Sequence, residues 1–313
     1  MKAAIVTQAG QSTPAFGEFE APVAGAGEVI IQVAAAAISP LVRARAAGTH
    51  YSSGGAFPFV AGVDGTGRLE DGRRVAFALP RAPFGAMAEQ VPVPAAHVVP
   101  LPEGLGDVAA AALINPGMSS WAALTERARL KRGETVLVNG ATGAAGQIAV
   151  DVARHLGAAR VIATGRNEAA LAELGADAVI PLGEDPDVLE QRFKAEFAQG
   201  VDVVLDYLWG PSAERLLIAG AKSGADGVPI RFVQVGSVSG GEISLPGAVL
   251  RSSAIELMGS GIGSISLGRL VAAIGAMLQA AAQDGFALPA RAMPLAEVAQ
   301  AWPLEGERVV LTV

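Results

Sequence analysis

The stretch Glu134–Asn167 reads ETVLVNGATGAAGQIAVDVARHLGAARVIATGRN and decides the fold. Residues 135–138 are apolar or β-branched without alternation, which is typical of a parallel strand buried on both faces. Small residues follow at 140–146, and then Ile148, Val152 and Leu156 recur at helical spacing. Gly157 ends that helix, and residues 160–164 give a second strand. The stretch therefore predicts a β-α-β unit of the length that a dinucleotide-binding fold needs.

The turn at 140–146 consists of glycine, alanine and one threonine. Because it has no bulky side chains, its backbone N–H groups and the positive end of the helix can approach a pyrophosphate. Gly146 also lets the helix pack closely on the strand. We therefore predict that a dinucleotide pyrophosphate binds at Thr142, Gly143, Ala144, Ala145 and Gly146.

The residues that end the second strand indicate which dinucleotide is preferred. NAD sites usually place Asp or Glu there to accept a hydrogen bond from the ribose 2′-OH, whereas a 2′-phosphate is met by a cation. This chain has Gly165-Arg166-Asn167 and no carboxylate. The guanidinium of Arg166, with Thr164 and Asn167 as further donors, predicts NADPH rather than NADH. The alternative is that Arg166 is a solvated loop arginine.

The composition is that of a globular protein. The chain has 313 residues, 51% hydrophobic and 17% charged, which is enough for two domains with cores. The net charge of −7 and the lack of a long basic cluster argue against a nucleic-acid or anionic-membrane surface. The absence of cysteine excludes disulfides, thiolate nucleophiles and cysteine-based zinc sites. Small molecules are the expected partners.

No segment predicts export or membrane insertion. The N-terminus, MKAAIVTQ, predicts an immediate strand rather than a signal peptide, so a cytoplasmic protein is expected. The apolar helix predicted for Leu270–Ala282 is shorter than the ~20 residues that a membrane span needs. It is interpreted as a buried helix.

The chain contains two kinds of sequence pattern. Residues 1–113 contain short strand patterns with frequent Gly and Pro, and strands predicted at 3–7, 29–35, 62–69, 74–77 and 87–93 fit a small β-barrel. After Leu113, strands and helices alternate up to a sixth strand at 254–259, which is the series of a doubly wound α/β sheet. Residues 266–313 return to one helix and short strands at 285–290 and 308–312.

Several segments, taken in order, resemble one known family: Val60–Val75, Gly85–Leu105, Ala110–Leu124, the Gly140 turn and Leu171–Val179. Together they resemble the zinc-independent quinone oxidoreductases and enoyl reductases of the medium-chain dehydrogenase/reductase superfamily. The resemblance implies an α/β fold with a GroES-like β-barrel catalytic domain (1–113 and 266–313) and a Rossmann NADPH-binding domain (114–265). It also implies NADPH-dependent hydride transfer to a quinone or an activated double bond, usually by a homodimer.

Two stretches depart from relatives of this superfamily. Gly62-Val63-Asp64 stands where zinc-dependent members carry Gly-His-Glu, and the three histidines are scattered, so no metal site is expected. Ser39-Pro40-Leu41-Val42 stands where many members carry Asn-Pro-x-Asp, so those polar contacts are lost or changed. Alcohol dehydrogenation through zinc is therefore disfavoured.

Tyr51 is the candidate catalytic residue. Some enoyl reductases of the family use a tyrosine after a glycine at the place where this chain has Gly48-Thr49-His50-Tyr51. A phenol titrates near ~10 and can therefore donate a proton or hydrogen bond to a developing enolate. The alternative is a packing or lid role. Quinone reduction would need no strong protein acid, because water can supply the proton.

Other residues are predicted to line the cofactor. Relatives place a threonine near the nicotinamide at the Ser119 position, so Asn115 and Ser119 are assigned there, with helix capping as the alternative. The carboxyl ends of the later strands add Asp206-Tyr207, Val235-Gly236-Ser237 and Gly259-Ser260-Gly261 to the same edge. Tyr207 and Trp209 have subunit or core packing as the alternative.

The predicted protein is thus an NADPH-dependent, zinc-independent reductase of quinones or α,β-unsaturated carbonyls. The alternatives are a catalytically idle NADPH-binding protein and a zinc-free ketone or alcohol reductase. Residues Ile255–Met258 predict an edge strand, which a second copy of the chain would cover in a homodimer.

Overall fold

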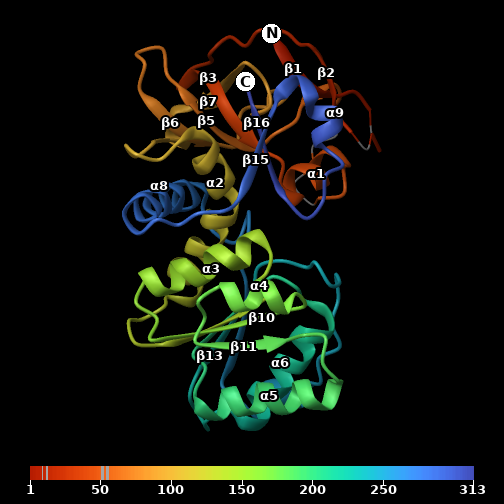
Figure 1. Ribbon diagram of the computed structural model, residues 1–313, viewed down its shortest axis with the longest axis vertical. Helices are drawn as coiled ribbons and strands as arrows, with labels where there is room; N and C mark the ends of the chain where they lie inside the picture. The colour runs from red at the N-terminus through yellow and green to blue at the C-terminus, as the bar shows by residue number, and fades with distance from the viewer. Residues whose placement is uncertain (9, 12, 51–52, 54–55) are drawn as a thin grey trace. The chain divides into compact units, whose positions relative to one another are not determined.

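The structure is a computed structural model that describes all residues except 9, 12, 51, 52, 54 and 55 (Figure 1). The chain forms two compact units. The first contains Met1–Met118 and Leu267–Val313, and the second contains Ser119–Ser266. The sequence analysis placed the unit boundaries at 113/114 and 265/266. In the structure they lie at 118/119 and 266/267, five residues and one residue further along the chain.

The second unit is built on a parallel sheet of six strands in the order β11-β10-β9-β12-β13-β14. The strands are β9 (Thr135–Asn139), β10 (Arg160–Gly165), β11 (Ala178–Pro181), β12 (Val203–Asp206), β13 (Ile230–Gln234) and β14 (Ile255–Gly259). All five pairings are parallel. The central strands are buried on both faces, which explains their continuous apolar sequences. The predicted doubly wound sheet is confirmed.

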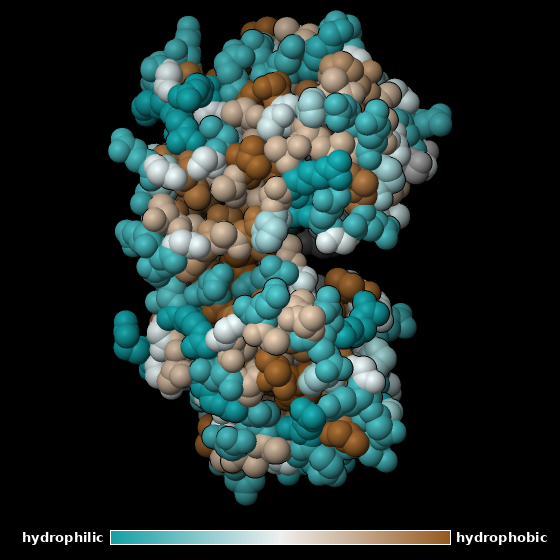
Figure 2. All heavy atoms as spheres, viewed as in Figure 1, coloured by the Kyte–Doolittle hydropathy of each residue, from teal (hydrophilic) through white to brown (hydrophobic). Residues whose placement is uncertain are grey.

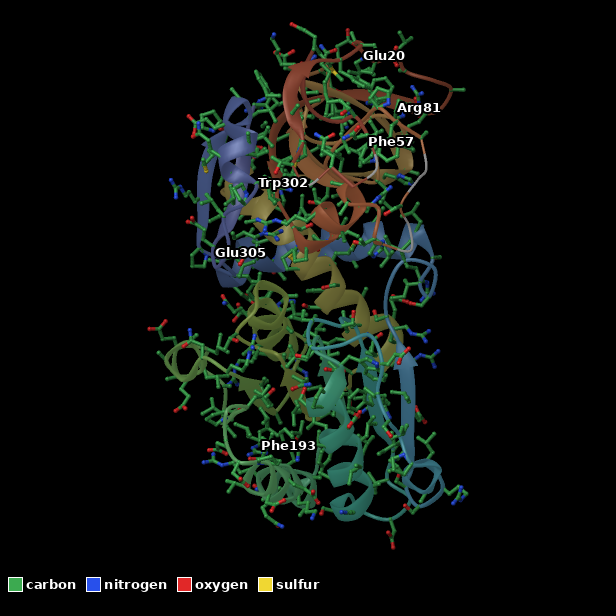
Figure 3. The ribbon with its side chains drawn as sticks, turned by 90° about the vertical axis from the view of Figure 1, so that its right-hand side faces the viewer. Glu20, Phe57, Arg81, Phe193, Trp302 and Glu305 are labelled. Atoms are coloured by element: carbon green, nitrogen blue, oxygen red, sulfur yellow. The ribbon has the colours of Figure 1, made fainter. Side chains whose placement is uncertain are left out.

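Helices cover both faces of this sheet. They are α3 (Ala144–His155), α4 (Glu168–Glu173), α5 (Pro186–Gln199), α6 (Gly210–Ser223) and α7 (Gly247–Arg251). Figure 1 shows α5 and α6 together on the face opposite α3. Phe193 of α5, labelled in Figure 3, packs with Phe197 and with Leu216 of α6 in the core of that face. These helices contribute through their apolar sides, as amphipathic helices on a sheet do.

The first unit is mainly antiparallel. Its smaller sheet joins β1 (Lys2–Val6), β2 (Ala15–Glu18) and β4 (Phe59–Val60). Its larger sheet has the order β15-β16-β3-β5-β6-β8, with β7 also paired to β3; the strands are β3 (Glu28–Ala37), β5 (Asp64–Arg68), β6 (Arg74–Ala78), β7 (Gln90–Pro94), β8 (Val98–Pro100), β15 (Ala290–Pro294) and β16 (Arg308–Thr312). Together they form the GroES-like barrel.

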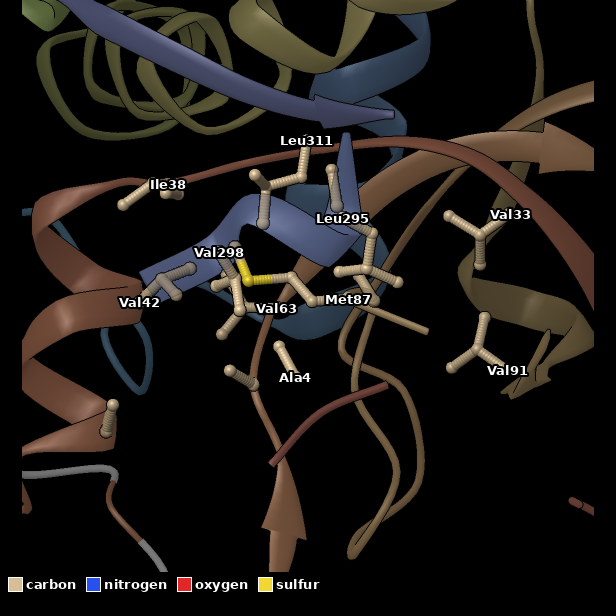
Figure 4. Packing of buried hydrophobic residues seen from close by; sticks show 14 of the residues in the cluster. Ala4, Val33, Ile38, Val42, Val63, Met87, Val91, Leu295, Val298 and Leu311 are labelled. Atoms are coloured by element: carbon tan, nitrogen blue, oxygen red, sulfur yellow. The ribbon is translucent and has the colours of Figure 1, made fainter. Parts of the chain in front are cut away.

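The C-terminal segment completes the core of the first unit. β16 pairs antiparallel with β3, and Leu311 lies beside Val298 and Met87 in the same cluster (Figure 4). Val42 and Val63, from two other segments, reach this cluster as well. Because apolar side chains from both ends of the chain bury one another, residues 267–313 belong to this unit although the second unit precedes them in sequence.

The remaining helices are α1 (Pro40–Ala46), α2 (Asp107–Ala122), α8 (Leu267–Asp284) and α9 (Val298–Ala301). The sequence analysis did not predict α1, although Ser39-Pro40 carries its start signal. The Oγ of Ser39 accepts a hydrogen bond from the N–H of Val42 at 3.1 Å, and Pro40 is at the first helical position. The stretch where the sequence analysis expected the family's polar contacts to be lost or changed therefore begins a helix.

One predicted strand is wrong. The strand expected at 285–290 lies at Ala290–Pro294 instead. Gly285 has a φ of +76° and ends α8, and Pro289, which has no N–H to donate, precedes the strand. Phe286 and Leu288 between them are buried by packing rather than by strand pairing.

The surfaces of both units are mixed. Figure 2 shows that hydrophilic side chains cover much of the viewed face of each unit, with hydrophobic side chains in smaller groups. In the part of the chain that the structure describes, no helix combines the length and the apolar character that a membrane crossing requires.

Candidate cofactor site

The strand ends of the second unit form one edge. The pairing registers place Asn139 beside Thr164 and Asp206, and Gln234 beside Asp206 and Gly259. All of these residues are at or next to the carboxyl ends of their strands, and parallel sheets bind ligands at that edge. The segments predicted to line the cofactor follow directly from it.

The turn after β9 depends on glycine in two different ways. Gly140 has a φ of +90°, which a residue with a side chain rarely adopts. A Cβ on Gly146 would lie 2.3 Å from the carbonyl oxygen of Gly140, so only glycine allows this close packing of α3. Both glycines are thus required by the fold.

Gly143 is different, because a Cβ there would meet no atom closer than 3.7 Å. It is exposed, and it is the N-cap of α3 without any side-chain cap. The space in front of this helix end is therefore left open by the chain itself. An open helix N-terminus lined by Gly143, Ala144 and Ala145 fits a pyrophosphate, as predicted for this turn.

A buried polar network holds this turn. The Nδ2 of Asn139 donates to Asp206 Oδ1 at 2.8 Å and to Ser212 Oγ at 2.9 Å. Thr164 Oγ1 donates to Asn139 Oδ1 at 2.7 Å and accepts from the N–H of Gly140 at 3.2 Å. Burial raises the pKa of Asp206, while its hydrogen bonds oppose that rise. Thr164 is fully buried, so its expected role as a phosphate donor is wrong; it positions the turn instead.

The sequence analysis missed Asn139. The available signal was its position, since a polar amide that ends a strand of buried apolar residues needs hydrogen-bond partners there. Asp206 was noted only as part of the cofactor edge, and its role as the acceptor at the centre of the network comes from the structure.

The end of β10 is followed by an exposed cation, Arg166. Arg166 is exposed and forms no hydrogen bond or ion pair with the described residues. Asn167 caps α4 by accepting a hydrogen bond from the N–H of Ala170 at 3.1 Å. A Cβ on Gly165 would lie 2.6 Å from Thr142 Cγ2, so this strand end packs against the turn after β9. Arg166 therefore follows a strand end that is in contact with the open glycine turn.

Ser119 and Asn115 lie in the interior of α2, four residues apart and hence on one helix face. Because the helix starts at Asp107, the capping alternative is wrong for both. Tyr207 is buried and its hydroxyl is 2.8 Å from Ser120 Oγ, with a further hydrogen bond to Ser119. Ser120 Oγ also donates to the carbonyl of Ala145 at 3.0 Å. This chain of hydroxyls connects α2 with the start of α3.

The aromatic residues after β12 belong to the interior. Burial raises the pKa of Tyr207, so its phenol stays protonated and can donate. The ring of Trp209 packs edge-on against Phe232 with centroids 6.5 Å apart, which supports core packing for this residue. The N–H of Trp209 donates to Asp206, so this turn also belongs to the polar network.

The far part of the edge comes from β13 and β14. Gln234 Nε2 donates to the carbonyl of Gly236 at 2.8 Å, and the N–H of Ser260 donates to the carbonyl of Gln234. A Cβ on Gly236 would lie 2.6 Å from the carbonyl oxygen of Tyr207. Val235, Ser237, Gly259 and Gly261 belong to the same two segments, and the N–H of Gly261 donates to Ser264 Oγ. These segments are thus brought together as predicted, and their contact with a cofactor stays a prediction.

The candidate catalytic residue Tyr51 lies outside the described residues, so its role stays a prediction.

The first unit also contains a buried carboxyl group to which the sequence analysis gave no role. Asp64 of β5 is 5% exposed; burial raises its pKa to about 7, and the positive charge of Arg308 opposes that rise. No group of three or more His, Asp or Glu side chains among the described residues is arranged to hold a metal ion.

Comparisons with known proteins agree with this architecture. The family model for zinc-binding dehydrogenases matches residues 144–279. A probable NADPH-dependent quinone reductase of Emericella nidulans is 32% identical over 99% of this chain and 99% of its own length. A mycocerosic acid synthase-like polyketide synthase of Mycobacterium tuberculosis is 32% identical over 75% of this chain, and the match spans 11% of that much longer protein.

Solved structures give the same result. The quinone oxidoreductase of Thermus thermophilus, also solved in complex with NADPH, covers the whole of both chains with a TM-score of 0.82 and 29% identity. A mycobacterial quinone oxidoreductase superposes with a TM-score of 0.85 over the whole of both chains at 24% identity, which shows a shared fold. From the full-length match to a quinone reductase and this shared fold, the chain belongs to the quinone oxidoreductase branch of the medium-chain dehydrogenase/reductase superfamily.

Proposed function

We propose that this chain is an NADPH-dependent, zinc-independent oxidoreductase that transfers hydride to a quinone or to the C=C bond of an α,β-unsaturated carbonyl compound. The observation that carries the proposal is the open helix N-terminus at Gly143, whose turn packs against the strand end that Arg166 follows. The names of the Emericella nidulans relative and of the Thermus thermophilus structure, which include NADPH and quinone, support it.

Different residues of the second unit bind the pyrophosphate and the 2′-phosphate of the cofactor in this proposal. Backbone N–H groups at Thr142–Gly146 bind the pyrophosphate, assisted by the positive end of α3. Arg166 forms charge-assisted hydrogen bonds with the 2′-phosphate. Asn139 and Thr164 contact no cofactor in this proposal; their buried hydrogen bonds fix the turn and so limit the entropy that binding costs.

The nicotinamide end is assigned to Asn115 and Ser119, with the segments Val235–Ser237 and Gly259–Gly261 as further lining. Tyr207 acts one step further away, because its hydroxyl is hydrogen-bonded to Ser119 and Ser120. A fixed Ser119 hydroxyl orients whatever group it contacts.

NADPH, when bound, supplies the hydride. A quinone then needs only a proton to give the hydroquinone, and water can deliver it. An enone needs in addition a hydrogen-bond donor at its oxygen while negative charge develops there. Tyr51 remains our candidate for that donor, since a phenol with a pKa near ~10 is protonated at neutral pH.

Anaerobic oxidation of NADPH, followed by its absorbance, tests the proposal with a matched panel of one quinone, one enone and one ketone. We expect turnover of the quinone, the enone or both. Turnover of the ketone alone would point to a zinc-free ketone or alcohol reductase. Tight binding of NADPH without turnover of any compound would point to a catalytically idle binding protein.

Independence from zinc is tested separately. We expect activity to survive exhaustive treatment with a chelator, because the first unit has Val63 where zinc-dependent members carry histidine. Activity that is lost on chelation and restored by added zinc would contradict this part of the proposal.

We also propose that the chain forms a homodimer through β14. This strand is at the end of the six-stranded sheet and would otherwise present unpaired backbone groups to water. Light scattering at micromolar concentration should give twice the chain mass of 31.5 kDa. A monomer mass would contradict the proposal.

A further inference from the structure

The first unit contains a pocket of about 460 Å³. Its lining comes from α1, from residues 56–63 and from residues 80 and 82–84, all within this unit. The volume lies within the range of roughly 300–1,000 Å³ that is usual for small-molecule sites. The cofactor edge described above belongs to the other unit and contributes no residue to it.

The pocket walls are apolar and rich in rings. Phe57, Phe59 and Phe84 line it together with several prolines. The rings of Phe57 and Phe59 are tilted against one another with centroids 5.5 Å apart. Phe57 is labelled in Figure 3 on the first unit. Aromatic walls of this kind favour flat ring systems, which stack or pack edge-on against them.

Arg45 is the one charged side chain among the described residues of the lining. It lies in the last turn of α1 and is half-buried. It forms no hydrogen bond or ion pair with any described residue, and burial lowers its pKa. Burial and the positive charge of Arg45 lower the pKa of the nearby His50, and a histidine, neutral or cationic, supplies no negative charge.

Three other arginines of this unit have partners. Arg43, also on α1, donates to the carbonyl of Leu304 at 2.7 Å. Arg74 pairs with Asp107 at 3.1 Å, and Arg81 pairs with Glu28 at 2.8 Å. A guanidinium that is partly desolvated without a partner costs free energy, so an anionic ligand in this pocket would remove a cost that the protein alone retains.

We propose that this pocket binds a flat, aromatic monoanion, with a carboxylate or an equivalent acidic group on Arg45 and the ring system against the phenylalanines. A planar carboxylate matches the two parallel donors of a guanidinium. One cation and no further charged lining residue among those described select a single negative charge over a polyphosphate. The proposal does not depend on hydride transfer, because it concerns binding within the first unit alone.

Isothermal titration of the full-length protein with 2-naphthoate tests this proposal, with 2-naphthamide as the neutral compound of the same shape. We expect saturable binding of 2-naphthoate that is at least tenfold tighter than that of the amide. Arg45→Gln should weaken 2-naphthoate binding at least tenfold and leave 2-naphthamide within twofold. Phe59→Ala should weaken both compounds by a similar factor.

Two control variants separate recognition from general effects. Arg73→Gln removes an equal charge from an exposed position that pairs with Asp71, and it should leave both affinities unchanged. Arg45→Lys keeps the positive charge but loses the two parallel N–H donors of the guanidinium. Binding of 2-naphthoate should therefore fall less than in Arg45→Gln. The proposal is overturned if 2-naphthoate does not bind, if Arg45→Gln leaves its affinity unchanged, or if that variant weakens acid and amide equally. Because no NADPH is present, these outcomes are independent of whether the chain reduces quinones.

Discussion

The two units hold buried charge in different ways. In the second unit, Asp206 accepts hydrogen bonds from Asn139 Nδ2 at 2.8 Å and from the N–H groups of Leu208 and Trp209 at 3.0 and 3.1 Å. In the first unit, Arg308 has a buried Nε and a buried Nη2 without a hydrogen-bond partner among the described residues. Arg45 likewise forms no hydrogen bond or ion pair with the residues that the structure describes.

This difference separates two kinds of site. A buried polar group without a partner costs about 1–3 kcal/mol, so the satisfied network of the second unit is stable by itself. It can therefore present backbone N–H groups in one fixed geometry to a group that every dinucleotide shares. Among its described residues, the first unit keeps two guanidinium groups that lack hydrogen-bond partners: Arg45, and Arg308 at Nε and Nη2, whose positive charge faces Asp64. We infer that the second unit is built for one constant ligand and that recognition of variable ligands falls to the first.

The largest expected effect is at Gly146, with Gly143 as its matched control. Gly146→Ala places a Cβ 2.3 Å from a backbone oxygen, so it should lower the free energy of unfolding by about 3 kcal/mol and weaken NADPH binding more than a hundredfold. Gly143→Ala meets nothing closer than 3.7 Å, so its stability should change by less than about 0.5 kcal/mol. Its NADPH affinity should still fall about tenfold, because the methyl group takes space that the phosphates need.

Urea unfolding and calorimetric titration with NADPH measure both quantities. If the two variants lose stability equally, the distinction between a packing glycine and a binding glycine is wrong. If Gly143→Ala binds NADPH as the parent does, the pyrophosphate is not in front of this helix end.

In the second unit, features set by a local sequence pattern could be predicted, and features set by distant residues could not. The strands at 135–138 and 160–164 were found within one residue because each strand is a local apolar run between turn residues. The role of Gly146 in close packing followed from the same local pattern. Asn139 could not be placed, because its partners Asp206 and Ser212 are 67 and 73 residues away in the chain.

The first unit was less predictable for a related reason. The start of α1 at Ser39-Pro40 was present in the sequence, but seven helical residues give too short a period to recognise. The pocket around Arg45 is lined by three segments that are separate in the sequence, so no local sequence pattern predicts it. At Ser39–Val42, where the family's polar contacts were expected to be lost or changed, the structure has a helix cap and a core valine.

The second prediction compares the two buried carboxyl groups by their pH dependence. Asp64 has a folded pKa of about 7 against an ordinary value of 3.8, so the folded state binds the proton more tightly than the unfolded state. Stability should therefore fall as pH rises from about 4 to about 7 and level off above, with a slope of at most about 1.4 kcal/mol per pH unit. Asp64→Asn should remove this slope.

Urea unfolding between pH 4 and pH 8 measures the difference between variant and parent. A constant offset from the altered surroundings of Arg308 does not affect this test, since only the change with pH counts. Asp206→Asn is the comparison from the other unit: its pKa is also raised, but hydrogen bonds oppose the effect of burial, so the pH-dependent difference should be smaller. If the stability difference from the parent changed equally with pH in both variants, the two units would not differ in how they hold a buried carboxyl group.

The third prediction concerns Arg166. Arg166→Ala should weaken NADPH binding about 10- to 100-fold and leave NADH within twofold, because a hydrogen bond to a charged group contributes about 1.5–3 kcal/mol. Arg192→Ala, on the exposed side of α5 where Arg192 pairs with Glu184, is the control and should change neither. Equal losses for NADPH and NADH would show that Arg166 does not contact the 2′-phosphate.

The smallest effect is expected at Tyr207, which tests whether the hydroxyl chain between α2 and α3 positions Ser119. Tyr207→Phe keeps the buried ring and removes the hydroxyl that contacts Ser119 and Ser120, while Ser120 keeps its bond to Ala145. Stability should therefore fall by about 1 kcal/mol and turnover of the quinone by only a few fold. Because burial raises the pKa of Tyr207, the hydroxyl stays protonated between pH 6 and pH 9, so variant and parent should give pH–rate profiles of the same shape. Ser120→Ala, which also breaks the chain, should give a loss of similar size. A hundredfold loss, or a profile that loses an alkaline limb in Tyr207→Phe alone, would mean that this phenol takes part in the reaction instead of holding Ser119 in place.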